Sequence, residues 1–391
     1  MCVYLNYCNR INNLLIKKVN ITPLFNKKLL QNIFSVSARN MSDSQEDVLI
    51  QNVDDKGIIC LNRPKALNSL NLSMVRKIYP TLAKWEKEKT LVIVKGAGDK
   101  AFCAGGDVKA VVESAFEGGD LGNQFFREEY ICNGLIGSYK IPYIAFIHGI
   151  VMGGGVGLSV HGKYRVATEK TLFAMPETQI GLFPDVGGTY FLPRLGGQLG
   201  YYLALTGFRL KGSDVMKAGI ATHFVQSDDL HNLEQELLQC KNENDVQYTL
   251  KKFHVKDLPE FSLTKDLDKI NYTFASDTVE GIVQKLENDC SEWGQQTLKL
   301  MQKMSPTSLK VSLKALEIGK KMDLLDCLQM EYRLATSCLA NKDFLEGVRA
   351  LLIDKDQNPQ WSPKKIEDVT NDIVHSFFTK LPDHQELKHR L

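Results

Sequence analysis

Two glycine-rich turns, each next to a short apolar run, constrain the fold of this chain more than any other feature. The first turn lies in residues 102–107 (FCAGGD), and the second lies in residues 148–155 (HGIVMGGG). Consecutive glycines remove side chains from the backbone, so their amide N–H groups can approach a ligand oxygen closely. If both turns donate an N–H group to one carbonyl oxygen, they form an oxyanion hole for an acyl group. For either turn alone, tight packing is the simpler interpretation.

The second turn also has to be compared with phosphate-binding loops. It lacks the Gly-Lys-Ser/Thr ending of a Walker loop. A dinucleotide fingerprint, Gly-x-Gly-x-x-Gly, that begins at Gly153 needs a glycine where the chain has Leu158. A fingerprint that begins at Gly155 needs one where the chain has Val160. The spacing therefore argues against a nucleotide site, although Glu177 lies near the distance expected for a ribose-binding acid.

Two carboxylates, Glu177 and Asp185, follow the glycine triplet along the chain. Such side chains can transfer protons or attack a carbonyl carbon. Glu177 could instead be a surface acid or a helix cap, and Asp185 could shape the turn before Val-Gly-Gly. His148 and His161 have no Cys or Ser partner at motif spacing, and we interpret both as structural. No cluster of His, Cys and acidic residues has metal-ligand spacing, so the sequence predicts no metal site.

The charge balance and the cysteines limit the partners and the compartment. The 391 residues include 48 basic and 46 acidic side chains, so no global field draws the chain to nucleic acid or to a membrane. No apolar run reaches the roughly 18 residues that span a bilayer. The nine cysteines form no C-x-x-C pair, which favours a reducing compartment. The apolar setting of Cys103 favours a packed thiol over a nucleophile.

Residues 1–42 differ in composition from the rest of the chain. They contain several Lys and Arg residues, and the first acidic residue is Asp43. A basic, acid-poor segment with interspersed Leu, Ile and Phe resembles a mitochondrial transit peptide, which predicts localisation in the mitochondrial matrix. The alternatives are a disordered start and a shorter product that begins at Met41.

Apolar runs alternate with helical patterns in the first half of the chain. Short buried strands are expected at 57–61, 91–95, 143–147, 164–168, 172–174 and 220–225. Helices are expected from Asn71, with a kink at Pro80, and around 125–138. The Gly- and Pro-rich residues 181–197 are expected to form a long loop. This alternation predicts an α/β fold with buried strands.

Helical patterns dominate the second half. Ser305 followed by Pro306 predicts the start of a helix in this region. We therefore predict a catalytic α/β core at 47–225, a mainly helical section at 226–380 and a tail at 381–391.

Several runs resemble a known family. Residues 62–68 (NRPKALN), residues 101–107 (AFCAGGD) and the triplet Gly153 to Gly155 resemble the crotonase superfamily of acyl-CoA enzymes. Five longer runs resemble the branch of that superfamily that hydrolyses 3-hydroxyacyl-CoA thioesters: 126–130, 152–161, 174–193, 331–334 and 347–350. The resemblance covers the chain from about residue 47 to the mid-370s. It implies a crotonase-like spiral of β-β-α units with a helical C-terminal section.

The resemblance also implies roles for individual positions. The backbone amides of Gly106 and Gly154 are expected to bind the thioester carbonyl oxygen. Glu177 is expected to act at the carbonyl as nucleophile or general base. Asp185 and Glu129 are expected to bind the substrate hydroxyl and to orient Glu177 or water. From the residues alone, either Glu129 or its neighbour, the glutamate at 128, could face the site.

Three further positions, Lys65, Ala66 and Lys109, correspond to places where the superfamily approaches the CoA moiety. CoA is part of the substrate, so no separate cofactor is expected. The expected partner is a small acyl-CoA molecule, with no nucleic acid and no membrane, and self-association into a homo-oligomer is possible in this superfamily.

Gly157 departs from the pattern of the wider superfamily. Enoyl-CoA hydratases carry a glutamate at this position, and hydration of a double bond uses two acids. The departure favours hydrolysis over hydration, and the resemblance implies that the substrates are 3-hydroxyisobutyryl-CoA and also 3-hydroxypropionyl-CoA, which would give CoA and the free hydroxy acid in valine breakdown. A hydratase or isomerase and a non-catalytic acyl-CoA-binding protein are the alternatives.

Overall fold

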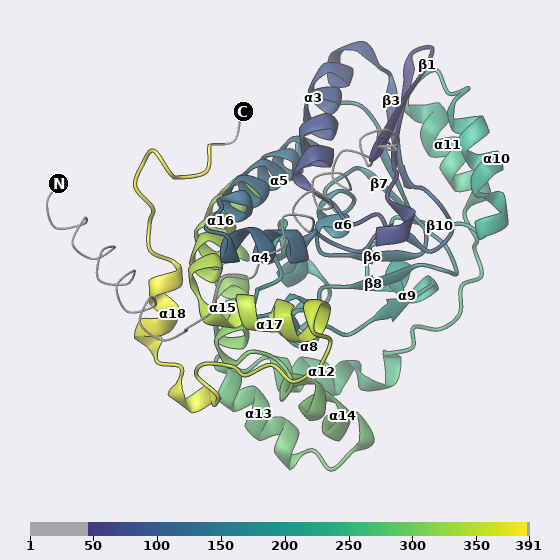
Figure 1. The fold of residues 1–391 in the computed structure, drawn as a ribbon. Helices are drawn as coiled ribbons and strands as arrows, with labels where there is room; N and C mark the ends of the chain where they lie inside the picture. The colour runs from purple at the N-terminus through teal and green to yellow at the C-terminus, as the bar shows by residue number, and fades with distance from the viewer. Residues whose placement is uncertain (1–45, 389–391) are drawn as a thin grey trace, which may run out of the picture. The chain divides into compact units, whose positions relative to one another are not determined.

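A six-stranded sheet forms one layer of the fold (Figure 1). The computed structural model describes residues 46–388, so the expected targeting segment 1–42 lies outside the described residues. In spatial order the strands are β1 (Val48–Val53), β2 (Lys56–Leu61), β3 (Leu91–Gly96), β5 (Tyr143–Ile147), β7 (Tyr164–Ala167) and β10 (His223–Phe224). β1 is antiparallel to β2, and the other neighbours are parallel. Both faces are covered, which explains why the central strands read as continuous apolar runs.

A second sheet has four short strands. In spatial order they are β4 (Ala101–Cys103), β6 (Ile150–Met152), β8 (Leu172–Ala174) and β9 (Leu210–Lys211). Along the chain β3 leads into β4, β5 into β6 and β7 into β8, with helical segments between these repeats. This repeated passage from one sheet to the other confirms the predicted spiral of β-β-α units.

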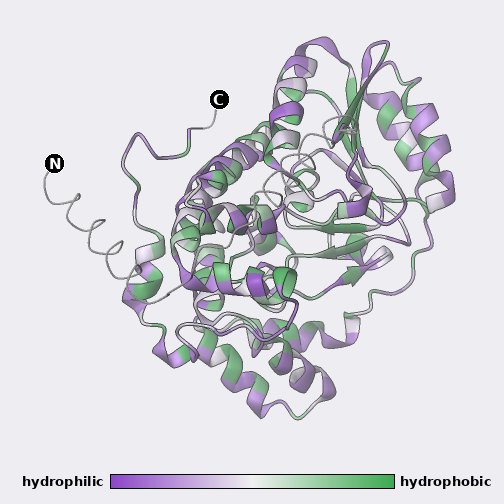
Figure 2. Cartoon of the chain, viewed as in Figure 1, coloured by the Kyte–Doolittle hydropathy of each residue, from purple (hydrophilic) through white to green (hydrophobic). Residues whose placement is uncertain are grey.

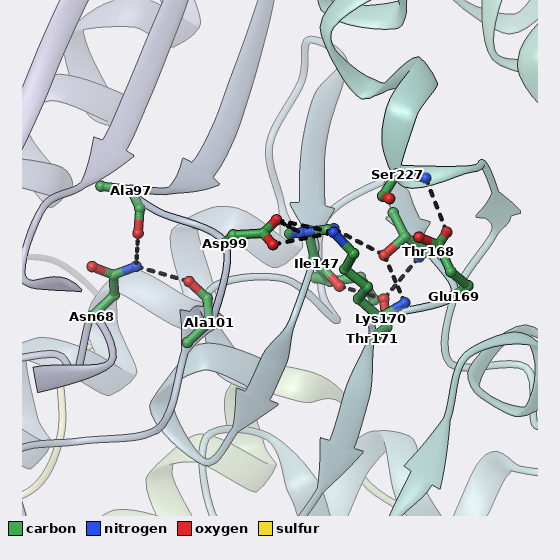
Figure 3. A network of polar contacts seen from close by, with 11 residues as sticks. Asn68, Ala97, Asp99, Ala101, Ile147, Thr168, Glu169, Lys170, Thr171 and Ser227 are labelled. Atoms are coloured by element: carbon green, nitrogen blue, oxygen red, sulfur yellow. Dashed lines mark hydrogen bonds and ion pairs between the residues drawn. The ribbon is translucent and has the colours of Figure 1, made fainter. Parts of the chain in front are cut away.

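Polar contacts tie the three connections between the sheets to one another (Figure 3). Asp99, in the β3–β4 connection, accepts a hydrogen bond from Lys170 of the β7–β8 connection at 3.1 Å. His148, in the β5–β6 connection, lies 2.7 Å from an Asp99 oxygen and 2.9 Å from the Thr168 hydroxyl. Asn68 donates to backbone carbonyls near both ends of the β3–β4 connection, at 3.0 and 2.8 Å. These contacts support the structural interpretation of His148.

The first long helix begins at a recognisable cap, and two further helices follow it in the first half of the chain. α3 (Leu72–Glu88) begins after Asn71, whose side chain accepts from the Met74 N–H at 2.8 Å, and it continues through Pro80. α4 (Val108–Phe116) follows the first glycine turn. α5 (Leu121–Gly137) starts a few residues before its expected position and packs against both α3 and a C-terminal helix, α16.

The second half is helical, as its patterns predict. Its longer helices are α10 (Leu230–Leu237), α11 (Glu243–Phe253), α12 (Leu267–Phe274), α13 (Val279–Asn288), α14 (Glu292–Met301), α15 (Pro306–Gly319) and α16 (Leu324–Ala340). They are followed by α17 (Lys342–Val348), a π-helical turn (Arg349–Ile353) and α18 (Asn371–Phe377). Ser305 caps α15 by accepting from the Ser308 N–H at 3.0 Å, which confirms the predicted helix start.

Hydrophobic residues gather on both faces of the first sheet. Figure 2 shows apolar residues along the central strands and a mixture of polar and apolar residues on α10 and α11. One core cluster joins Ile93 and Phe146 to Leu233 and Leu250, so α10 and α11 cover one face. The larger cluster on the other face contains α3, α5 and the C-terminal helices. The burial of these apolar surfaces holds the two sheets and their helices together.

One expectation about local structure was wrong, and another was right only in part. Residues 181–197 contain a short helix, α7 (Gly188–Phe191), and a 3-10 turn (Leu192–Arg194) in place of one long loop. The expected strand at 220–225 is reduced to the two residues of β10. Across residues 46–388, no helix combines the length and apolar character needed to cross a bilayer.

Candidate active site

A cavity of about 340 Å³ lies where the ends of β4 and β6 meet. The two strands are parallel neighbours, so the glycine turns at their carboxyl ends lie beside each other. The other walls come from α5, from residues 176–185 and from Leu351, Leu352 and Gln357 near the C-terminus. The spiral therefore brings together both glycine turns and the acidic residues that the sequence singles out.

Each turn presents one backbone N–H group that takes no part in the backbone hydrogen bonds of its own turn. Leu70 bonds to the Gly105 carbonyl and to the Asp107 N–H, both at 2.8 Å, and this bridge leaves the N–H of Gly106 outside it. Gly154 is the first residue of the short helix α6 (Gly154–Gly157), where an N–H has no intrahelical acceptor. These are the two amides that the resemblance assigns to the oxyanion hole.

The glycines at this site cannot be replaced without a collision. A Cβ atom on Gly154 would lie 2.5 Å from a carboxylate oxygen of Glu129 and 3.3 Å from the Gly106 nitrogen. Gly153 has φ of 45°, and a Cβ atom there would lie 3.1 Å from a Glu177 oxygen. The absence of side chains is thus what lets the two turns and two acids share one space.

Three buried carboxyl groups border the cavity: Glu129, Glu177 and Asp185. Glu177 begins the 3-10 turn after β8, Glu129 lies on α5, and Asp185 precedes α7. The Tyr130 hydroxyl donates to Asp185 Oδ2 at 2.7 Å. Glu129 Oε1 and Glu177 Oε2 have no hydrogen-bond partner among residues 46–388. Two acid oxygens are therefore available to a substrate or a water molecule.

Burial raises the pKa of all three acids. Burial raises the pKa of Glu177 well above its usual range, and the Asp185 charge raises it further. Burial and the charges of Asp185 and Glu177 act in the same direction on the pKa of Glu129. Burial raises the pKa of Asp185 to about 7, against the lowering effect of the Tyr130 hydrogen bond. At neutral pH the three groups therefore share fewer than three negative charges.

The structure distinguishes the two adjacent glutamates of α5. Glu129 is 2% exposed and borders the cavity. Glu128 faces outward and accepts hydrogen bonds from the guanidinium of Arg76, the shortest at 2.6 Å. Glu129 is therefore the inward-facing member of the pair, in agreement with the resemblance.

Cys103 is buried and His161 is partly buried, and neither has a nucleophilic arrangement. Burial raises the pKa of the Cys103 thiol to about 12, and its sulfur lies 3.5 Å from the Gly105 carbonyl oxygen. Burial lowers the pKa of His161 to about 4, and its Nε2 lies 2.7 Å from the Val186 carbonyl oxygen. The neutral imidazole therefore donates to the backbone, and the thiol is a packed one, as the sequence indicates.

The three expected CoA contacts lie away from the cavity walls. Lys65 and Ala66 are exposed in a 3-10 turn (Pro64–Ala66), and Lys109 is exposed on α4, 3.7 Å from a Glu113 oxygen. In the described part of the chain none of the three lines the cavity. Their approach to CoA stays a prediction.

Sequence reasoning missed several residues of the site. Tyr130 bonds to Asp185, and its position directly after Glu129 in a family-like run was the available signal. Leu351, Leu352 and Gln357 come from the far end of the chain. The family-like run 347–350 ends just before them, but their contact with the cavity depends on tertiary structure.

Gly157 lies where a second acid would collide with the protein. A Cβ atom on Gly157 would lie 2.7 Å from Val186 Cβ and 2.8 Å from Asn133 Nδ2. Both neighbours are buried. The glycine at 157, where hydratases carry a glutamate, is therefore a position at which neighbouring atoms leave no room for a side chain. Among residues 46–388, no group of three His, Cys, Asp or Glu side chains is arranged to hold a metal ion.

Comparison with known proteins assigns the chain to a family. The family described as enoyl-CoA hydratase/isomerase matches residues 56–378. The mitochondrial 3-hydroxyisobutyryl-CoA hydrolase of Xenopus tropicalis is 57% identical over 334 residues, which cover 83% of this chain and 86% of that protein. The human protein of the same name is 53% identical over 348 residues, which cover 87% of this chain and 90% of that protein.

Solved structures agree with this assignment. A carnitinyl-CoA dehydratase from Mycobacterium thermoresistibile is similar with a TM-score of 0.83 and 36% identity, covering 88% of this chain and 99% of that one. An enoyl-CoA hydratase from Rhodobacter sphaeroides 2.4.1 is similar with a TM-score of 0.81 and 36% identity, covering 88% of this chain and 100% of that one. The spiral, the paired glycine turns and these similarities lead to one conclusion: the chain belongs to the enoyl-CoA hydratase/isomerase family of the crotonase superfamily.

Proposed function

We propose that this protein hydrolyses the thioester of 3-hydroxyisobutyryl-CoA to CoA and 3-hydroxyisobutyrate, a step of valine breakdown. The relatives that are identical to it at more than half of the aligned positions carry the name of this hydrolase. The observation that carries the proposal is the cavity itself, in which two available amides face three buried carboxyl groups. The collision at Gly157 disfavours the hydratase arrangement of acids. The related 3-hydroxypropionyl-CoA is a second expected substrate.

The thioester carbonyl oxygen binds between the N–H groups of Gly106 and Gly154. As a nucleophile adds to the carbonyl carbon, charge moves onto this oxygen, and the two amides stabilise it. Removing one donor of this kind typically lowers a rate by about 100- to 1,000-fold. The two amides thus supply stabilisation of the transition state without any side chain.

Glu177 supplies the attack on the carbonyl carbon. In one route its carboxylate adds directly, the tetrahedral intermediate expels CoA thiolate, and the thiolate takes a proton from water. A second water molecule then opens the mixed anhydride. In the other route Glu177 takes the proton from the water that attacks, the tetrahedral intermediate expels CoA thiolate, and the protonated Glu177 gives this proton to the thiolate. Both routes end with CoA, the free acid and a regenerated carboxylate.

Asp185 and Glu129 bind the 3-hydroxyl group of the substrate and keep Glu177 or water oriented. A carboxyl group that shares protons with its neighbours can both donate to and accept from a hydroxyl. An acyl group without the hydroxyl leaves these buried groups unpaired, and such a mismatch discriminates strongly between substrates. Isobutyryl-CoA should therefore be a much poorer substrate.

We propose that the reaction needs no cofactor beyond the CoA of the substrate. We also propose that Lys65, Ala66 and Lys109 contact the outer part of this CoA. Relatives named mitochondrial and the basic composition of residues 1–42 support localisation in the mitochondrial matrix. Import of a reporter fused to residues 1–42 tests this localisation, and a reporter that stays outside mitochondria would contradict it.

Release of CoA tests the reaction. Purified protein is mixed with 3-hydroxyisobutyryl-CoA, and free thiol is measured with a trapping reagent. We expect rapid thiol release, and slow release from isobutyryl-CoA, which lacks only the hydroxyl. A hydratase would instead add water to methacrylyl-CoA without thiol release, and a binding protein would bind without turnover. Either result would overturn the proposed hydrolysis.

Incorporation of oxygen-18 separates the two chemical routes. During one turnover in labelled water, the direct route transfers label into the Glu177 carboxylate if water attacks the carboxylate carbon of the anhydride, whereas the general-base route leaves Glu177 unlabelled. Mass spectrometry of the peptide that contains Glu177 measures the difference.

The pH dependence of kcat/KM should reflect the raised pKa values. An attacking carboxylate must be ionised, so activity should rise with pH through the raised pKa of the acids, well above the usual 4.3 of glutamate. Asp185→Asn removes a charge that raises the pKa of Glu177, so the remaining activity should reach half its maximum at a lower pH. Glu128→Gln is the matched surface control and should leave the profile unchanged. A wild-type midpoint near 4.3 would contradict the expectation.

A further inference from the structure

The turn that carries Asp185 is strained. Val186 has φ of 52°, a left-handed conformation that a β-branched residue rarely adopts, and Gly187 follows with φ of 82°. A strained conformation of this kind persists only where surrounding contacts fix it, and such contacts often serve a functional site. The contacts that fix this turn therefore bear on the position of the Asp185 carboxylate.

Glu331 makes most of these contacts from outside the cavity. It lies on α16 and is fully buried. Its Oε2 accepts from the Gly187 N–H at 2.7 Å. Its Oε1 accepts from the Thr189 N–H at 2.9 Å and from the Thr189 hydroxyl at 2.6 Å. One carboxylate thus binds the chain on the C-terminal side of Val186 through three hydrogen bonds, two from backbone N–H groups and one from a side-chain hydroxyl.

A second contact fixes the centre of the turn. His161 Nε2 donates to the Val186 carbonyl oxygen at 2.7 Å. A Cβ atom on Gly187 would lie 2.3 Å from this nitrogen, so the ring also packs directly on the turn. On the N-terminal side, the Gly188 N–H donates to the Asp185 carbonyl oxygen at 2.7 Å.

We propose that Glu331 is a positioning residue that holds the Val186 turn, and through it the Asp185 carboxylate, in the geometry that binds the substrate hydroxyl. The inference deepens the proposed function and rests on it for the role of Asp185. It also gives a role to the family-like run 331–334, which sequence analysis left without one. Glu331 touches neither the cavity nor the substrate, so its effect passes through the backbone of Gly187 and Thr189.

The hydrogen bonds identify the state of Glu331 that does this. All three hydrogen-bond partners that Glu331 has among residues 46–388 are donors, and a carboxylate accepts from all of them. Burial raises the pKa of Glu331 to about 8 against the lowering effect of the bonds from Thr189 and Gly187, so the fully ionised anchor is expected above that pH. A glutamine at this position would direct an NH₂ group at one of the donors. Glu331→Gln therefore preserves the volume and removes part of the anchor.

The alternative is that Glu331 merely docks α16 onto α7. A loss of docking would lower the fraction of folded enzyme and reduce activity toward every substrate equally. A displaced Asp185 would instead reduce the advantage of substrates that carry the 3-hydroxyl. The ratio of kcat/KM for 3-hydroxyisobutyryl-CoA to that for isobutyryl-CoA separates these two roles.

The test compares Glu331→Gln with the control variant Glu234→Gln. The Glu234 carboxylate is also buried, and it forms an ion pair with Lys95 at 2.6 Å on the opposite face of the first sheet. We expect Glu331→Gln to lower the kcat/KM ratio by about 10- to 100-fold, the effect of a small displacement of a positioned group. The control should leave the ratio unchanged. An equal loss for both substrates in Glu331→Gln would overturn the inference.

A milder variant and a measurement without turnover keep the test decisive. Thr189→Val removes one donor to Glu331 and should lower the ratio in the same direction by less. Amide hydrogen exchange at Gly188, whose acceptor is not Glu331, should accelerate in Glu331→Gln and not in the control. If the wild-type enzyme releases no CoA, the proposed function fails, while the exchange at Gly188 still decides whether Glu331 holds the turn. Unchanged exchange would overturn the inference.

Discussion

Replacing Glu177 with glutamine should abolish thioester hydrolysis and at the same time raise the thermal stability of the protein. The amide can neither attack the carbonyl nor take a proton from water, so kcat should fall by about 100- to 10,000-fold or more. Binding of the acyl-CoA should persist, because the two glycine amides and the rest of the cavity are unchanged. Thiol release and equilibrium binding measure the two effects separately.

The gain in stability follows from the raised pKa of Glu177. Burial penalises the ionised form in the folded state, whereas the unfolded chain ionises near the usual 4.3. The folded state therefore binds more protons between that pH and the raised pKa, and its stability falls as the pH rises through this window. Glutamine has no ionisation to oppose, so the melting temperature of the variant should exceed that of the wild type by about 2 °C or more near pH 8.

The matched control for this experiment is Glu128→Gln, the same chemical change at a surface ion pair. It should alter neither turnover nor the dependence of the melting temperature on pH. Full activity of Glu177→Gln would refute the assignment of Glu177. An unchanged or lower melting temperature at pH 8 would show that ionisation of the buried Glu177 carboxyl group does not destabilise the folded protein.

Introducing the hydratase acid, as Gly157→Glu, should destabilise the protein without creating a hydratase. The new Cβ atom would lie within 2.8 Å of both Val186 and Asn133, and overpacking of this kind costs about 1–3 kcal/mol. Burial of a further carboxyl group adds to that cost. The collision with Val186 also pushes on the turn that carries Asp185, so the hydrolysis should be lost with the stability.

Two simpler glycine variants separate these effects. Gly157→Ala adds only the Cβ atom, so it should lower the melting temperature without the cost of a charge. Gly196→Ala is the control, because its exposed glycine has no atom within 4 Å of the added carbon. If Gly157→Glu has the melting temperature of the wild type and hydrates methacrylyl-CoA, steric exclusion at Gly157 does not explain why this chain lacks the glutamate of hydratases.

The sequence predicts the main sheet and the principal site well for identifiable reasons. The strands at 91–95 and 143–147 are buried on both faces, so they appear as unbroken apolar runs. The glycine turns and the acids Glu177 and Asp185 lie within continuous runs that resemble one family. Local patterns of this kind can be recognised in the sequence without knowledge of the tertiary structure.

The remaining features depend on contacts between distant parts of the chain. β4 and β6 have only three residues each, too few to show the alternation that marks a strand, and both lie within or beside the glycine turns. The choice between Glu128 and Glu129 depends on Arg76, which lies on another helix. The role of Glu331 depends on a turn that is 142 to 144 positions away in the sequence.

The link between Glu331 and the Val186 turn has a consequence for the order in which the protein becomes competent. Both glycine turns and all three cavity acids lie in the first half of the chain, before residue 186. The anchor of their last member, and the cavity residues Leu351, Leu352 and Gln357, come from the second half. A nascent chain that already contains every reacting group would therefore still lack catalysis. We expect activity to begin only when α16 has packed against α5 and α7, when the chain is nearly complete.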